Sequence, residues 1–285
     1  MKKVFLLLVL IFSQHICANW IYSLDEAKLI ALNSNKFILV EYYFSESSEM
    51  RRFNLDSWSN EAILKSADSF VLLRMPFDSN SFSGNNKINK KNINFLKLSL
   101  LQILDCNGKI IDNLEYSLIK KQLTDLLNNY SISTEFLSVD LMSCYKNTCF
   151  NTSARVAQKY LDFSLLVDNE IKSNILKVSD EYLSEAKKDL SKKDDDYNEK
   201  HQKLELLELF RFAYSLNFTK LEKKLVQFKE IDILENNLNY YYFLNYMVAK
   251  GLGKENFTEI DSKYKLIEGF DEFIKKSELI LFKKV

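Results

Sequence analysis

Residues 37–58 read FILVEYYFSESSEMRRFNLDSW, and this stretch decides the fold of the first part of the chain. Its first seven residues are apolar, β-branched or aromatic apart from Glu41, the pattern of a central strand that is buried on both faces. Residues 45–48 are small and polar, as in a turn, and residues 50–55 have a helical pattern. The stretch therefore predicts a buried strand, a short turn and a helix in direct succession.

The sequence on either side alternates between helix and strand patterns. Residues 24–32 have the apolar spacing of a helix, and Ser23 with Glu26 has the spacing of a capping box at its start. DCNG at 105–108 is a turn signal. Further helices are predicted over 60–65 and 118–127, and further strands over 70–75, 98–104 and 109–111. The predicted order is a strand–helix–strand unit followed by two adjacent strands and a closing helix.

Trp20, the LDEA sequence at 24–27 and the SWSNEAI sequence at 57–63 form a second pattern around this order. Together with the later strand and D-x-x-G turn at 99–109, they resemble secreted or periplasmic domains of the thioredoxin superfamily. In that family a tryptophan and a short helix precede a strand that leads into a W-C-x-x-C turn. The resemblance covers residues 20–127 and implies a central mixed sheet flanked by helices.

The same resemblance shows where the redox chemistry of the family is missing. It places Ser47 and Met50 at the two active-site cysteines, and Ser99 at the cis-proline that faces them. Thiol–disulfide exchange needs a thiolate nucleophile and a resolving thiol, which serine and methionine do not supply. A hydrolytic role for Ser47 needs a general base, but His201 lies far away in the sequence, so we interpret Ser47 as a helix-capping residue. Ser99 is expected to take a trans peptide bond, so we expect the substrate groove of the family to be reshaped or absent.

Residues 1–18 have the pattern of a secretory signal. Lys2 and Lys3 precede an apolar run over 4–12 that is too short to span a bilayer, and Ala18 is a small residue suited to cleavage. An uncleaved anchor is the alternative. We therefore expect export to the periplasm or the extracellular space, with no integral membrane span in the mature chain.

The charges of the chain are balanced and dispersed. The 39 basic and 39 acidic residues include no basic block, which argues against nucleic acid as a partner. Aromatic residues make up 13% of the chain, enough for a packed core. These features favour a folded protein whose partner is another protein or a peptide.

Three cysteines follow the signal. Cys106, in the turn at 105–108, is predicted to be exposed, either as a free thiol or as a link between two chains. Cys144 and Cys149 form a C-x4-C motif in a predicted linker over 131–153. A local disulfide is our first interpretation in an exported protein, and a redox-active pair is the alternative. A single histidine after residue 18, His201, leaves too few ligands for zinc, so neither a metal nor another cofactor is expected.

The resemblance predicts a thioredoxin-like domain over residues 19–130. Residues 154–285, which follow it and the linker, have the pattern of a nearly all-helical domain. Apolar faces recur over 154–190, 200–216, 221–228, 238–250 and 263–281. This predicts a helical bundle or a degenerate tetratricopeptide-like stack. One stretch is dense in aromatic residues, which we interpret first as a packed helix face and second as a binding patch for a partner. Its members are Tyr240, Tyr241, Tyr242 and Phe243.

These patterns predict an exported, redox-inactive, thioredoxin-like protein that acts as a protein-binding, chaperone-like or assembly module. The alternative is a thiol–disulfide oxidoreductase or isomerase that uses Cys144 and Cys149. A third hypothesis is a purely structural envelope or secreted protein whose helical half makes the contacts.

Overall fold

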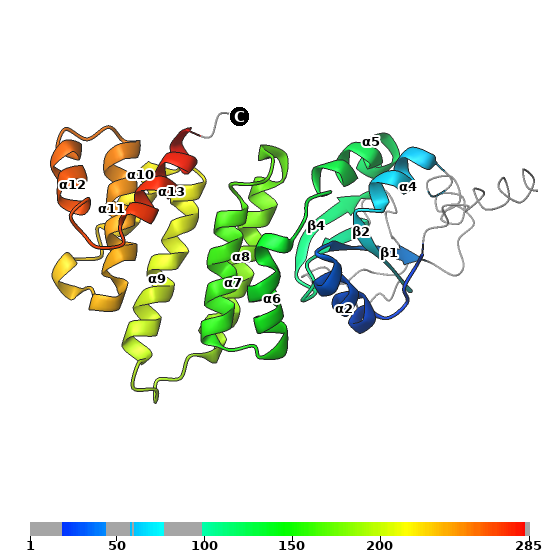
Figure 1. The fold of residues 1–285 in the computed structure, drawn as a ribbon, viewed down its shortest axis with the longest axis horizontal. Helices are drawn as coiled ribbons and strands as arrows, with labels where there is room; N and C mark the ends of the chain where they lie inside the picture. The colour runs from blue at the N-terminus through cyan, green and yellow to red at the C-terminus, as the bar shows by residue number, and fades with distance from the viewer. Residues whose placement is uncertain (1–18, 44–57, 59, 77–98, 283–285) are drawn as a thin grey trace, which may run out of the picture. The chain divides into compact units, whose positions relative to one another are not determined.

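The computed structural model describes residues 19–43, 58, 60–76 and 99–282. The chain divides into two compact units, residues 1–108 with 113–131 and residues 109–112 with 132–285. The first is a mixed α/β unit and the second is helical (Figure 1). A mixed α/β domain followed by a helical part is therefore confirmed.

A four-stranded mixed sheet forms the centre of the α/β unit, with the order β2-β1-β3-β4. Its strands are β1 (Phe37–Tyr43), β2 (Phe70–Pro76), β3 (Ser99–Leu104) and β4 (Ile110–Glu115). β1 runs parallel to β2, with Phe37 opposite Phe70, and antiparallel to β3, with Ile38 opposite Leu104. Because β1 lies between two neighbours and is covered on both faces, its first five residues are buried, which explains the continuous apolar run.

Among the described residues, three helices accompany the sheet: α2 (Leu24–Ser34), α4 (Glu61–Ala67) and α5 (Tyr116–Asn129). Figure 1 shows α2 on one side of the strands and α4 and α5 on the other. α2 begins where predicted, since the Ser23 hydroxyl accepts from the Glu26 N–H at 3.4 Å. Asn60 caps α4 in the same way, with its Oδ1 accepting from the Ala62 N–H at 2.9 Å.

The helical unit is built from helices that pack mainly against their neighbours in sequence. They are α6 (Glu135–Lys146), α7 (Phe150–Phe163), α8 (Asn169–Asp189), α9 (Tyr197–Tyr214), α10 (Phe218–Leu225), α11 (Leu238–Gly251), α12 (Phe257–Tyr264) and α13 (Asp271–Phe282), with short 3-10 turns η2 (Glu230–Asp232) and η3 (Glu235–Asn237). Figure 1 shows α6, α7 and α8 side by side with nearly parallel axes. This layered arrangement follows from broad apolar faces on consecutive helices.

The prediction of a linker over 131–153 is wrong. Most of this stretch is α6, followed by the first turn of α7. Leu137, Leu141 and Cys144 are buried, because spacings of four and three residues place them on the face of α6 that packs against α7. The polar residues around the C-x4-C motif obscure this short amphipathic pattern.

Aspartate–tyrosine pairs connect helices of this unit. The buried Tyr214 hydroxyl on α9 donates to Asp162 Oδ1 on α7. Lys276 Nζ on α13 lies 2.9 Å from the same carboxylate. A second pair connects α11 to α12, where the Tyr246 hydroxyl donates to Asp261 Oδ1 at 3.0 Å. These contacts link helices that lie far apart in the sequence as well as sequential neighbours.

Candidate functional site

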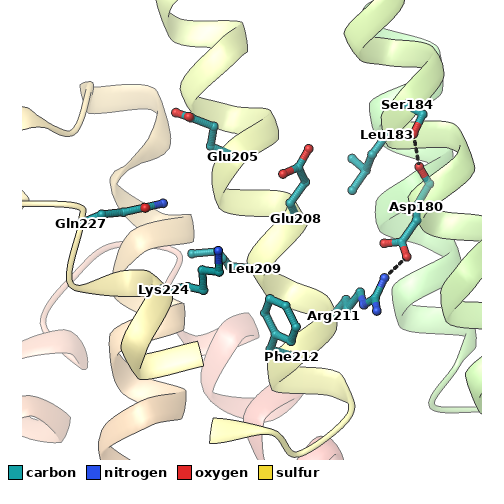
Figure 2. Close-up of a pocket in the computed structure, with 10 residues that line it drawn as sticks. All are labelled: Asp180, Leu183, Ser184, Glu205, Glu208, Leu209, Arg211, Phe212, Lys224 and Gln227. Atoms are coloured by element: carbon teal, nitrogen blue, oxygen red, sulfur yellow. Dashed lines mark hydrogen bonds and ion pairs between the residues drawn. The ribbon is translucent and has the colours of Figure 1, made fainter. Parts of the chain in front are cut away.

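A groove with a volume of about 460 Å³ runs over α8, α9 and α10 (Figure 2). α9 forms its centre, α8 one wall, and α10 with the residue just beyond it the other wall. Its lining residues are Asp180, Leu183 and Ser184 from α8, Glu205, Glu208, Leu209, Arg211 and Phe212 from α9, and Lys224 and Gln227. Three consecutive helices are therefore needed to build this site.

The bottom of the groove is apolar. Leu183 and Leu209 are 4% and 5% exposed, so they belong to the core and offer only their edges to the groove. Phe212 is half-buried, which leaves part of its ring accessible. The apolar face of α9 is broad, so residues at its edge are only partly covered by α8 and remain accessible in the groove.

Charged side chains of both signs surround this apolar strip. Arg211 on α9 forms an ion pair and a hydrogen bond with Asp180 on α8. Burial raises the pKa of the Asp180 carboxyl, and the Arg211 guanidinium opposes that rise. Glu208 lies 3.8 Å from Lys187, a separation at which an exposed pair contributes little stability. Among the described residues Lys224 forms no ion pair, so its ammonium group is available on the opposite wall.

The groove presents apolar and charged groups side by side. The lining combines an apolar strip with carboxylates on α9 and a cation on α10, a set that suits a protein segment with an apolar side chain between charged neighbours. In the described part of the chain, no group of three histidine, cysteine or acidic residues is placed to hold a metal ion.

Two of the three positions that the resemblance assigns to a thioredoxin active site, Ser47 and Met50, lie outside the described residues. Ser99 is the first residue of β3, the strand that pairs with β1.

Glu41, the one charged residue of β1, is 1% exposed and hydrogen-bonded through both carboxylate oxygens. Trp58 Nε1 donates to its Oε1 at 2.8 Å, and Arg74 Nε donates to its Oε2 at 2.7 Å. Arg74 also lies over the Trp20 ring at 4.3 Å, and Trp20 meets Trp58 edge to face at 4.9 Å. Burial raises the pKa of the Glu41 carboxyl, against the opposing effects of Trp58 and Arg74. Each of these four residues contacts two of the others, and together they hold the C-terminal half of β1 in place.

The cluster could have been predicted by comparing the two strands with each other, although neither strand reveals it alone. Glu41 and Arg74 are each the fifth residue of a buried strand, and the parallel register places them directly opposite each other. Opposite charges at equivalent positions of two apolar strands therefore predict a cross-strand ion pair.

The prediction that Cys106 is exposed is wrong, because it is 3% exposed. The predicted turn is present, but its first two residues, Asp105 and Cys106, are buried in the unit. The Asp105 carboxylate accepts from the Asn107 N–H at 2.9 Å, and Gly108 adopts a left-handed conformation with φ of 88°. Because Asp105 is also buried, the turn packs Cys106 into the unit.

Cys144 and Cys149 are free thiols in the structure, so the predicted disulfide is not formed there. Cys144 is buried in the last turn of α6, and Cys149 is half-buried as the N-cap of α7. The redox state of the pair stays a prediction.

The aromatic stretch packs within the helical unit. Tyr241 and Phe243 are buried, so these two do not belong to an exposed binding patch. Tyr240 meets Phe210 with ring centroids 5.7 Å apart. Tyr242 meets Tyr264 at 4.8 Å. The structure favours the interpretation as a packed helix face.

No known protein-family model, curated protein or solved structure matches this chain. Among its described helices, none combines the length and the apolar character needed to cross a bilayer.

Proposed function

We propose that this chain is an exported thioredoxin-like protein without a thioredoxin redox centre, and that it acts as a protein-binding or assembly module. The strand–helix–strand order, the parallel β1–β2 pair and the antiparallel β3 support the thioredoxin-like assignment. The replacements at Ser47, Met50 and Ser99 support the loss of the family's chemistry. Export is supported by the signal-like pattern of residues 1–18.

The groove over α8, α9 and α10 carries the proposal that the protein binds a partner. Its chemistry specifies the occupant as a protein segment with an apolar side chain for the strip beside Phe212. A basic neighbour of that side chain faces Glu205 and Glu208, and an acidic neighbour faces Lys224.

The size of the groove limits its affinity. Burial of one apolar side chain contributes about 1.5–3 kcal/mol, and each exposed ion pair about 0.2–1 kcal/mol. Association and the ordering of the segment cost several kcal/mol in return. The groove alone therefore supports a weak, salt-sensitive contact, and stronger binding requires further surface from the partner.

Peptide display on the purified protein tests this proposal. We expect enrichment of sequences that carry an aliphatic or aromatic residue next to lysine or arginine. Synthetic versions of the enriched peptides are then titrated by fluorescence anisotropy. Glu205→Lys combined with Glu208→Lys should weaken their binding at least about tenfold.

The matched control is Glu255→Lys combined with Glu259→Lys, the same charge change at exposed positions at and before the start of α12. This control should bind like the unmodified protein. Failure to enrich any such sequence, or equal loss of binding in the two double variants, would overturn the groove as the binding site.

A further inference from the structure

The turn between α6 and α7 places two thiols, those of Cys144 and Cys149, beside the start of α7. Cys144 Sγ lies 3.9 Å from Ser153 Oγ, and Cys149 Sγ lies 3.5 Å from Thr152 Oγ1. Thr152 and Ser153 are consecutive residues of α7. The two sulfur atoms therefore lie beside consecutive residues in the first turn of α7.

The two thiols differ in accessibility and in hydrogen bonding. Cys149 is the half-buried N-cap residue of the 14-residue α7, where backbone N–H groups have no partner within the helix. Hydrogen bonds with the Thr152 hydroxyl and with the backbone at the helix start lower the pKa of the Cys149 thiol, and burial and the Asp189 carboxylate oppose that shift only in part. Cys144 is 2% exposed, and burial raises the pKa of its thiol.

This asymmetry suits a reaction in two steps. The more accessible sulfur, whose pKa is lowered, reacts first, because the thiolate is the nucleophile. A buried neighbour that keeps its proton reacts only once a mixed disulfide has formed beside it. A disulfide here would close only a short loop, and short loops restrict the unfolded chain least. The arrangement is therefore better suited to exchange than to a structural crosslink.

We propose that Cys149 and Cys144 form a thiol–disulfide exchange site within the helical unit, with Cys149 as the attacking residue and Cys144 as the resolving residue. This inference goes beyond the proposed binding function and does not depend on it. The substrate class is a low-molecular-weight disulfide such as oxidised glutathione.

The Cys149 thiolate attacks one sulfur of oxidised glutathione, which forms a mixed disulfide and releases one glutathione thiolate. Cys144 then gives its proton to water and attacks the Cys149 sulfur. The Cys144–Cys149 bond forms, and the second glutathione thiolate leaves. The two protein thiols are oxidised to one disulfide, and one glutathione disulfide is reduced to two thiols.

Timed alkylation with iodoacetamide across a pH series, read by peptide mass spectrometry, tests the first step. In the reduced protein at pH 7, Cys149 should be alkylated at least about tenfold faster than Cys144, with a pH midpoint below that of free cysteine. Thr152→Val should raise that midpoint, and Thr152→Ser, which keeps the hydroxyl, should leave it nearly unchanged. Far-UV circular dichroism of each variant confirms that the helices remain folded.

Incubation with oxidised glutathione tests the second step. The unmodified protein should form the Cys144–Cys149 disulfide, and Cys144→Ser should stop at a Cys149–glutathione mixed disulfide. Cys149→Ser should form neither product, and Cys106→Ser, a change in the other unit, should behave like the unmodified protein. Equal alkylation rates of the two thiols, absence of the mixed disulfide in Cys144→Ser, or a disulfide that resists millimolar reduced glutathione would each overturn the proposal.

Discussion

The two units bury their polar groups in different ways. In the α/β unit, Glu41 lies within the sheet at 1% exposure, and Trp58 and Arg74 supply its hydrogen bonds. In the helical unit, tyrosines such as Tyr214 are buried and only the hydroxyl reaches a carboxylate. That carboxylate, Asp162, keeps 22% of its side chain exposed.

The difference concerns where the charge is located. A fully buried carboxylate loses its hydration, so its stability depends on every partner it retains. A tyrosine buries an apolar ring and places a neutral hydroxyl near the edge of the core, where the aspartate keeps contact with water. The α/β unit should therefore be more sensitive to the loss of a single polar group than the helical unit.

The largest expected effect comes from Glu41→Ala. The change leaves the Arg74 guanidinium and the Trp58 N–H without their acceptor, and we expect a loss of about 3–5 kcal/mol in the free energy of unfolding of the α/β unit. Both tryptophans of the chain, Trp20 and Trp58, lie in this cluster, so denaturant titration followed by tryptophan fluorescence reports on this unit directly.

The exposed residue Glu61 provides the control, since Glu61→Ala removes a carboxylate that is not buried. Combining Glu41→Ala with Arg74→Ala should cost less than the sum of the two single changes, because the pair is then removed together. A loss below about 1 kcal/mol for Glu41→Ala would contradict the importance of this cluster.

Tyr214→Phe tests how strongly the helical unit depends on one buried tyrosine hydroxyl. The ring remains while the hydrogen bond to Asp162 is lost, and Lys276 still pairs with that carboxylate. We expect a loss of about 1.5–3 kcal/mol, measured by far-UV circular dichroism, which is dominated by the helical unit. A loss as large as that of Glu41→Ala would show that both units are equally sensitive.

Gly251→Ala examines how closely the helices pack. An added Cβ would lie 2.5 Å from the Phe218 ring, and ring atoms close to the backbone have little room to move. We expect a loss of about 1–3 kcal/mol from overpacking. The same change at an open helical position stabilises by up to about 1 kcal/mol, so stabilisation here would show that α10 and α11 separate easily.

The smallest expected effect is a change in how the free energy of unfolding of the α/β unit depends on pH. Burial raises the pKa of Glu41, so between the ordinary carboxyl pKa and this raised value the folded state binds more protons than the unfolded state. Its contribution to the free energy of unfolding therefore falls as the pH rises through that window. Glu41→Gln should remove this part of the slope in fluorescence-monitored titrations at several pH values. Unchanged slopes would show that Glu41 titrates normally.

Local patterns were sufficient for most individual elements. The apolar run at 37–43, the Ser23 cap and the long helical faces after residue 154 each depend on residues within one or two turns of each other, and each is present in the structure. Cys106 and the α6 segment were predicted wrongly. Burial in a turn and packing of a short helix are decided by what lies opposite them.

By itself, the sequence determined the order of the described strands and of most described helices, the division into a mixed unit and a helical unit, and the absence of cysteines at Ser47 and Met50. Tertiary structure decided the Glu41–Arg74 pair, the groove shared by α8, α9 and α10, and the placement of Cys144 and Cys149 beside Ser153 and Thr152. Secondary structure follows from periodicity along the chain. Sites form where strand register and helix packing bring separate elements together, and one-dimensional spacing does not specify those distances.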